Sequence, residues 1–218
     1  MRGDVIIVEE HHRQAADRIA TRLAPEIAER ARRTTLAVAG ESGSGKSETA
    51  HALLEAFEKR GLRTTVLQQD DYFVLPPKQN DAARRRDITW VGPPEVRLDF
   101  LDQHLAAAQA GAPSVTKPLV IYAEDRTVEE TLDLEGFQVV IAEGTYTTLL
   151  EHVDDRIFIA RNRLETMAAR RRRAREAPDP FIEDILEIEH RIISAHRARA
   201  SVIISRDYEV EFAQPVVS

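Results

Sequence analysis

The stretch Gly40-Glu41-Ser42-Gly43-Ser44-Gly45-Lys46-Ser47 decides the fold of this chain. It matches the pattern G-x-x-x-x-G-K-[ST], in which a glycine-rich loop turns backbone N–H groups toward phosphate oxygens. The lysine brings a positive charge to the outer phosphates, and the hydroxyl of Ser47 is placed to ligate Mg²⁺. We therefore predict that a nucleotide binds at the following residues: Gly40, Ser42, Gly43, Ser44, Gly45, Lys46, Ser47 and Glu48.

The sequence on both sides of this loop supports the same interpretation. Residues 35–39 form a short apolar run that predicts a buried strand. Residues 46–60 carry apolar side chains at helical spacing, among them Leu53 and Phe57, and this helix is expected to stop at Gly61. A chance match would not require a strand before it and a helix after it, so we disfavour a coincidental glycine-rich loop.

Composition and charge limit the class of protein. The chain has 218 residues, of which 43% are hydrophobic and 31% charged, and this suits one soluble α/β domain. Its net charge of −7 argues against a fold built to coat nucleic acid. The absence of cysteine excludes disulfides and thiolate metal sites. Since no apolar run is long enough for a signal peptide or a membrane span, we expect a cytoplasmic protein with no membrane or nucleic-acid partner.

Short apolar runs alternate with helical patterns along the rest of the chain. This alternation predicts an α/β fold, the P-loop NTPase fold, with a mostly parallel sheet flanked by helices. The expected strands are residues 35–39, 64–68, 119–122, 127–133, 138–142, 156–160 and 201–204. The expected helices are residues 11–33, where Pro25 is expected to break or restart the helix, 46–60, 93–109, 163–177 and 180–197. Residues 74–93 are polar and predict a long loop.

Acidic residues follow two of the predicted strands. Asp70 and Asp71 come after residues 64–68, and Glu143 ends a later strand. Ligands of an open parallel sheet bind beyond the carboxyl ends of its strands, so these acids are expected beside the phosphate loop. We predict Asp70 as a base that takes a proton from an acceptor hydroxyl, and Glu143 as a Mg²⁺ ligand together with Ser47. A helix cap or solvated turn is the alternative for either acid. For Asp71 a cap of the following turn is favoured over assisting Asp70 or binding metal.

The segment 163–177 concentrates positive charge on a net acidic chain. It contains Arg163, Arg170, Arg171, Arg172, Arg173 and Arg175. One interpretation is a solvated basic face or an RNA-binding patch. We favour a lid over residues 161–180, whose arginines close over the transferring phosphoryl group, stabilise its charge and exclude water. The shorter arginine run at 84–86 fits a solvated loop and an anion-binding clamp equally well.

These motifs, in this order, resemble the uridine kinase and phosphoribulokinase family of P-loop kinases. The resemblance runs from about residue 35 to residue 206 and is carried by the phosphate loop and by residues 69–73, 90–105, 117–126, 143–146 and 171–176. It implies ATP as co-substrate, Mg²⁺ as cofactor and a small molecule as acceptor. It implies acceptor contacts from Tyr72, Tyr122 and Arg126. It also implies catalytic roles for Lys46, Asp70, Arg171, Arg172 and Arg175.

The sequence departs from that family where the acceptor is recognised. Uridine kinases carry an aspartate for the ribose hydroxyls at a position where this chain has Gly92, and no histidine lies between Tyr122 and Arg126. We therefore predict transfer of the terminal phosphate of ATP to a hydroxyl of a small molecule, without specifying a pyrimidine nucleoside. The acceptor classes left open are a nucleoside, a sugar, and an alcohol that bears a phosphate or carboxylate. Arg85 and Arg86 would contact an acceptor of the last, anionic class.

Two other classes of function stay open from the sequence. A nucleotide-switch or assembly ATPase would hydrolyse ATP without an acceptor, and a kinase-derived protein could bind RNA through its basic helix. The aspartate at the strand end and the arginine lid argue against the first of these. We divide the chain into an N-terminal helical addition, residues 1–33, and a P-loop kinase domain, residues 34–218, with residues 74–93 on the acceptor side. Whether it forms a homo-oligomer is left open.

Overall fold

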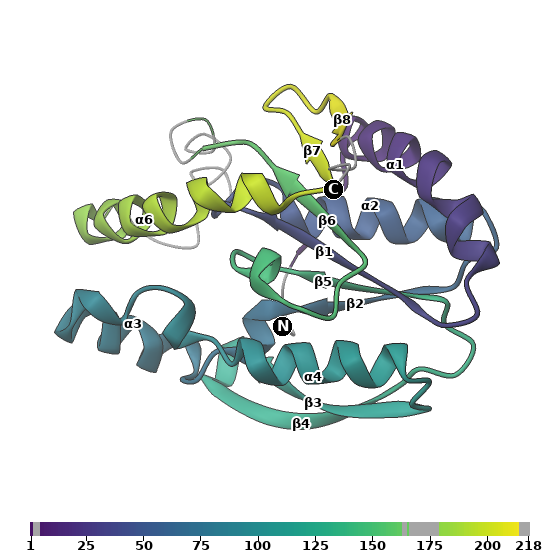
Figure 1. Ribbon diagram of the computed structural model, residues 1–218. Helices are drawn as coiled ribbons and strands as arrows, with labels where there is room; N and C mark the ends of the chain where they lie inside the picture. The colour runs from purple at the N-terminus through teal and green to yellow at the C-terminus, as the bar shows by residue number, and fades with distance from the viewer. Residues whose placement is uncertain (2–4, 163–164, 166–178, 214–218) are drawn as a thin grey trace.

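A six-stranded sheet lies at the centre of the chain, whose computed structural model describes residues 1, 5–162, 165 and 179–213 (Figure 1). Its strands, in the spatial order β2-β5-β1-β6-β7-β8, are β2 (Thr64–Gln68), β5 (Val139–Glu143), β1 (Thr34–Gly40), β6 (Asp155–Ile159), β7 (Val202–Ile204) and β8 (Val210–Phe212). The strands from β2 to β7 in this order run parallel, and β8 pairs antiparallel with β7 at the edge. The predicted α/β fold with a mostly parallel sheet is confirmed, and β8 is an addition to it.

The strands at the middle of the sheet are buried on both faces. Every residue of β1 and of β5 is buried, as expected for strands of a parallel sheet with few polar residues. Because side chains alternate across a strand, Leu36 and Val38 of β1 face one hydrophobic core, while Ala37 and Ala39 face the other. The sheet therefore separates two cores, and helices cover each of them.

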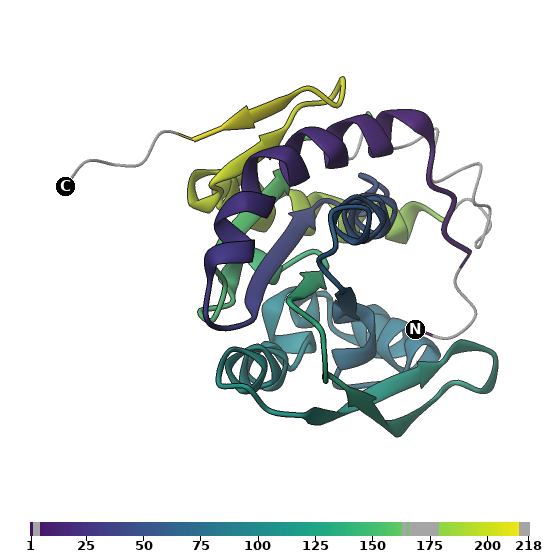
Figure 2. The same cartoon turned by 90° about the vertical axis from the view of Figure 1, so that its right-hand side faces the viewer.

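Two helices cover the first core. Helix α1 (Glu10–Glu29) packs against α2 (Lys46–Glu58), and both bury apolar side chains there, including Ile19 and Leu53 (Figures 1 and 2). Helix α1 continues through Pro25, so the predicted break is wrong. Proline removes one backbone hydrogen bond, but Ala24 and Ile27 on either side of it are buried in the core and hold the last turn in place. The N-terminal helix thus shares its core with the phosphate loop.

The second core lies between the sheet and α4 (Leu98–Gln109). The end of α6 (Pro180–Ile193), the 3₁₀ turn η6 (Ser194–Arg199) and the turn η5 (Thr147–Leu149) pack beside it. Strands β3 (Ser114–Ile121) and β4 (Arg126–Asp133) form a separate antiparallel hairpin against α4, joined by η4 (Tyr122–Glu124) (Figure 1). The helix predicted over residues 180–197 is thus α-helical only as far as Ile193, and the residues after it form the 3₁₀ turn η6.

Residues 74–93 form a helix and turns rather than the predicted long loop. Helix α3 (Pro77–Arg86) begins on a proline, whose missing N–H is tolerated in the first turn. It is followed by η2 (Ile88–Trp90) and η3 (Pro93–Glu95), and α4 begins only at Leu98, so the helix predicted from residue 93 is split. Asn80 is the one buried residue of α3. The helix therefore has no apolar periodicity from which it could be predicted, and polar contacts hold it.

Candidate active site

The phosphate loop joins β1 to α2 at the carboxyl edge of the sheet. Gly43 and Gly45 have φ angles of 76° and 98°, which residues other than glycine rarely adopt. A Cβ on Gly45 would also lie 2.6 Å from Tyr208 Oη and 3.0 Å from His12 Nε2. Helix α2 begins at Lys46, directly after this turn, so the loop leads into a helix N-terminus. Backbone N–H groups and the helix dipole therefore converge on one place, as phosphate binding requires.

The polar side chains of the loop divide into accessible and buried ones. Ser42 borders a cavity described below, whereas Ser44 and Glu48 are buried. Tyr208 Oη donates a hydrogen bond to the carbonyl oxygen of Ser44 at 3.2 Å, which ties the turn before β8 to the loop. Lys46 Nζ donates to the carbonyl oxygen of Glu41 at 3.1 Å, so its ammonium lies against the loop backbone.

Ser47 and Glu143 meet beside the loop. In the sheet Val38 is the Cα partner of Glu143, so the end of β5 lies next to the end of β1. Ser47 Oγ donates a hydrogen bond to Glu143 Oε1 at 3.0 Å. Burial, reinforced by Asp70, raises the pKa of Glu143 to about 7, while Lys46 and the Ser47 hydrogen bond act in the opposite sense. A hydroxyl and a buried carboxylate are hard oxygen donors that suit Mg²⁺, and a divalent cation would compensate the buried negative charge.

Asp70 follows β2, in the 3₁₀ turn η1 (Gln69–Tyr72), and faces the cavity. Strand β2 neighbours β5, with Gln68 opposite Glu143, so Asp70 and Glu143 leave the same edge of the sheet. The carboxylate is accessible from the cavity, while protein surrounds it on its other sides. This desolvation raises the pKa of Asp70, and Lys46 acts in the opposite sense. An accessible carboxylate of raised basicity beside a phosphate loop can take a proton from a bound alcohol.

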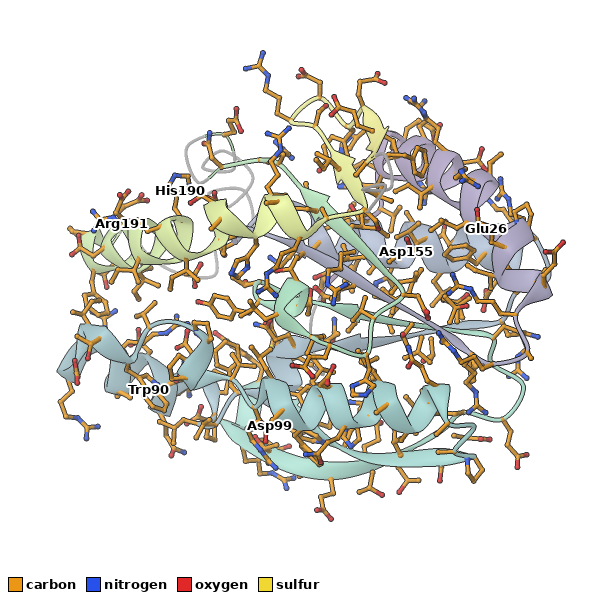
Figure 3. All side chains as sticks on the ribbon, viewed as in Figure 1. Glu26, Trp90, Asp99, Asp155, His190 and Arg191 are labelled. Carbon is orange, nitrogen blue, oxygen red and sulfur yellow. The ribbon has the colours of Figure 1, made fainter. Side chains whose placement is uncertain are left out.

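The cavity has a volume of about 310 Å³, and many of its lining residues come from α3 and α6. These two helices lie across from each other in Figure 1. Asp70 and Ser42 stand at its phosphate-loop end. The polar side chains that α3 and α6 contribute are Asn80, Asp81, Arg84 and Glu189. Its apolar lining is Phe73, Leu75, Pro77, Tyr122, Ile182, Ile185 and Leu186. Met1 also borders the cavity, with its α-amino nitrogen 3.1 Å from Asp71 Oδ1. Figure 3 shows the side chains of both walls, with Trp90 labelled after α3 and His190 on α6.

Tyr72 and Asp71 hold the fold rather than face the cavity. The Tyr72 ring is fully buried, and its hydroxyl lies 2.8 Å from His104 Nδ1, so the predicted acceptor contact by this side chain is wrong. Asp71 Oδ2 accepts a hydrogen bond from Lys117 Nζ at 3.0 Å, and Oδ1 accepts one from the backbone N–H of Val120 at 2.9 Å. Asp71 therefore anchors the β3–β4 hairpin to the end of β2, which corrects the predicted turn cap.

The other residues predicted on the acceptor side occupy different places. Tyr122 lines the cavity and is 42% exposed. Arg126 pairs with Glu124 on the surface and is not among the lining residues. Because the hairpin turn at Tyr122 lies at the cavity while Arg126 begins β4, the structure brings only the tyrosine to this place.

The three arginines at 84–86 face different partners. Arg84 lines the cavity, and its guanidinium donates two hydrogen bonds of 2.7 Å to the carboxylate of Glu95. Arg85 is exposed and pairs with Asp179 at the start of α6, and Arg86 is exposed as well. Neither lines the cavity, so the predicted acceptor contacts from Arg85 and Arg86 do not occur in this arrangement. Once the segment is helical, consecutive residues point in different directions, which separates Arg84 from its neighbours.

Sequence reasoning missed Glu189. Ile182, Ile185 and Leu186 precede it at helical spacing and line the cavity with it. A carboxylate on the apolar stripe of a helix was the available signal. Gly92 has no side chain that could reach the acceptor region, and its φ of 137° is one that other residues rarely adopt. Helix α6 therefore supplies the acidic group on this side of the cavity.

The predicted lid arginines Arg171, Arg172 and Arg175 lie outside the described residues, and the lid stays a prediction. Across residues 5–162 and 179–213, none of the helices combines the length and apolar character that crossing a bilayer demands.

Comparisons with known proteins show the family and the fold of this chain. Residues 35–161 match the model of the Phosphoribulokinase / Uridine kinase family. The bifunctional alpha-galactosidase/sucrose kinase AgaSK of Mediterraneibacter gnavus is 30% identical over 192 residues, which are 82% of this chain but 20% of that protein. This chain thus spans about a fifth of its length. The uridine kinase of Lactococcus lactis subsp. cremoris is 25% identical over 181 residues, 78% of this chain and 86% of that one. The structure of phosphoribulokinase from Rhodobacter spheroides has the same fold, with a TM-score of 0.65 at 12% identity over 85% of this chain and 82% of that chain.

Proposed function

Because the chain belongs to the phosphoribulokinase/uridine kinase family, whose named relatives are small-molecule kinases, we propose that it transfers the terminal phosphate of ATP to a hydroxyl of a small molecule in a Mg²⁺-dependent reaction. The acceptor O–H bond breaks and Asp70 takes the proton. The acceptor oxygen bonds to the terminal phosphorus, and the bond from phosphorus to the bridging oxygen breaks and leaves ADP with that electron pair. A cytoplasmic location is part of this proposal.

The observation that carries this proposal is the position of Asp70. Its carboxylate borders a cavity of about 310 Å³ that also reaches Ser42 of the phosphate loop. A cavity of this size has room for a small acceptor between the base and the phosphate loop. A nucleotide-switch ATPase has no need of a base aimed into an acceptor-sized space. The same position therefore favours a kinase over that alternative.

Each of the other groups has a defined task in this reaction. Backbone N–H groups of residues 43–47 hold the phosphates, and Lys46 neutralises the outer ones. Ser47 and Glu143 would hold Mg²⁺, which supplies charge neutralisation at the phosphate oxygens when bound. We assign Arg171, Arg172 and Arg175 to a lid that closes over the transferring group and excludes water. Tyr122 borders the acceptor.

The test measures ADP formation by the purified chain with ATP and Mg²⁺ and a panel of acceptors: fructose, sucrose, uridine, fructose 6-phosphate and glycerate. We expect at least one acceptor to raise ADP formation and to yield a phosphorylated product. We expect Asp70→Asn to lower kcat by about 100-fold or more with ATP affinity retained, as for a positioned base. A rate of ATP hydrolysis that ignores every acceptor would favour the switch ATPase, and near-native kcat in Asp70→Asn would remove the base role.

A further inference from the structure

Glu189 is an acidic side chain on the apolar wall of the acceptor cavity. It comes from α6, in line with Ile182, Ile185 and Leu186, and is 7% exposed. Its Oε1 lies 3.8 Å from Arg84 Nη2, beyond hydrogen-bond distance. Its Oε2 is buried and has no hydrogen-bond partner among the described residues. The side chain is therefore a buried carboxylate at the cavity with an unused acceptor atom.

Keeping such a group costs free energy unless a ligand satisfies it. A buried carboxylate without hydrogen bonds is strongly disfavoured, because nothing replaces the water it has lost. Burial raises the pKa of Glu189 to about 7, while Arg84 and Lys46 act in the opposite sense. A ligand in the cavity that donates hydrogen bonds to the Glu189 carboxylate would offset this cost.

The two cationic groups among the described lining residues, Arg84 and the α-amino group of Met1, are already paired. The guanidinium of Arg84 binds Glu95 with both of its hydrogen bonds, and Glu95 is fully buried. The α-amino group of Met1 pairs with Asp71. The acidic side chains that border the cavity are Asp70, Asp81 and Glu189. Asp81 pairs with Arg85, so the excess negative charge of the described lining rests on Asp70 and Glu189, which Lys46 offsets in part. Two carboxylates that offer hydrogen-bond acceptors disfavour a phosphate or carboxylate on the acceptor.

The shape of the cavity limits the acceptor further. Its volume of about 310 Å³ is at the lower end of the range for small-molecule sites. Phe73 and Tyr122, with Leu186 from α6, give it apolar surface beside the carboxylates. A molecule with several hydroxyls on a small ring of C–H groups matches both features, because hydroxyls donate to carboxylates and C–H faces pack on apolar side chains. A nucleoside carries a nucleobase in addition to its sugar, so it would need more volume than a monosaccharide.

We propose that the acceptor is a small neutral sugar, and that Glu189 binds it by accepting hydrogen bonds from hydroxyls other than the one that is phosphorylated. The inference rests on the proposed function, because it concerns the acceptor of that reaction. It assigns Asp70 to the reacting hydroxyl and Glu189 to the orientation of the remaining ones. Arg84 positions Glu189 from the opposite wall and makes no ion pair with the acceptor.

The first experiment uses the unmodified full chain and pairs of acceptors that differ in charge. Fructose is compared with fructose 6-phosphate, and glycerol with glycerate, with uridine as a further acceptor, at equal concentrations with saturating ATP and Mg²⁺. We expect kcat/KM to favour the neutral member by about tenfold or more, with fructose the better of the neutral acceptors. Preference for either anion, or activity confined to uridine, would overturn the inference while leaving the kinase reaction intact. Failure of every acceptor to raise ADP formation would instead contradict the proposed function.

The second experiment compares two glutamates of α6. Glu189→Gln is nearly isosteric and removes the charge, and we expect it to raise KM for fructose about tenfold with little change in kcat or in KM for ATP. Glu187→Gln is the matched control, because Glu187 pairs with Arg191 at 3.2 Å on the outer side and does not border the cavity. We expect it to leave all three constants within about twofold. Equal KM for fructose in both variants would overturn the role of Glu189. The charge preference of the unmodified chain does not depend on how either variant folds.

Discussion

Replacing Arg84 by methionine tests whether polar contacts hold α3 in place. Glu95 is fully buried and accepts hydrogen bonds from Arg84 Nε and Nη2 at 2.7 Å each, from Asn80 Nδ2 at 3.0 Å and from the Gly92 N–H at 3.2 Å. Methionine keeps most of the aliphatic length of Arg84 but leaves Glu95 with neutral donors only. Breaking one side of a buried ion pair costs about 3–5 kcal/mol, because the remaining charge is uncompensated. We expect Arg84→Met to lose stability in that range.

Thermal and urea unfolding measure this loss, and the neighbouring arginine provides the control. For a chain of this size each kcal/mol moves Tm by about 2–4 °C, so Arg84→Met should lower Tm by roughly 6–20 °C. Arg85→Met is the same substitution one residue along α3. The Arg85 side chain is 45% exposed and its partners Asp81 and Asp179 are exposed or half-exposed. Surface pairs of this kind contribute about 0–1 kcal/mol, so this variant should unfold close to the unmodified chain.

The double variant Arg84→Met with Glu95→Gln separates charge from packing. A neutral amide at position 95 does not need the guanidinium, so the double variant should recover part of the stability lost in Arg84→Met. Equal losses in Arg84→Met and Arg85→Met would refute the argument that a buried charge fixes α3. If the double variant loses as much stability as Arg84→Met and Glu95→Gln together, the loss in Arg84→Met comes from packing and not from the uncompensated charge of Glu95.

Two further predictions concern stability and pH. The folded pKa of Glu189 is raised to about 7 from an ordinary 4.5, so its stabilising contribution is full below pH 4.5 and is lost as pH rises through 7. Urea unfolding at several pH values should therefore show a loss of roughly 3 kcal/mol over that window that Glu189→Gln does not share, and parallel pH profiles for the two proteins would contradict it. Tyr72→Phe leaves the buried His104 Nδ1 without its partner and should cost about 1–3 kcal/mol of stability, with KM for the acceptor unchanged. A several-fold rise in that KM would indicate that the Tyr72 hydroxyl does contribute to acceptor binding.

The phosphate-loop half of the site could be predicted because its residues stand at strand ends. The motif at 40–47 places Lys46 and Ser47 by its own geometry. Adjacent parallel strands then bring their carboxyl ends together, as the alignment of Val38 with Glu143 in the sheet demonstrates. An acidic residue directly after β2 or β5 therefore lies near the loop, because the order of the strands in the sheet alone sets its position. The positions of Asp70 and Glu143 beside the loop therefore follow from the sequence.

The acceptor half could not be predicted in the same way, because polar contacts across distant segments build it. Helix α3 has no apolar stripe, and it is held by the bonds from Arg84 and Asn80 to Glu95 in the following turn. Such a network leaves no periodic signal in the sequence. The arginine run at 84–86 therefore looked like a single charged feature, although its members have separate surroundings once the helix forms.

The role of Glu189 does not follow from the sequence alone. The helical spacing in the sequence already places Glu189 on the same face as Ile182 and Ile185. A charged residue on an apolar helix face can form an ion pair, face water or bind a ligand. The contacts of the side chain in the structure distinguish these three roles. The pair that Glu189 makes with Arg84 is long, at 3.8 Å, and Arg84 already donates two shorter hydrogen bonds to Glu95. A water-exposed position is excluded by its burial. What remains is a buried carboxylate whose residue borders the same cavity as the proposed base, and a hydroxyl-rich acceptor is the ligand that would use both.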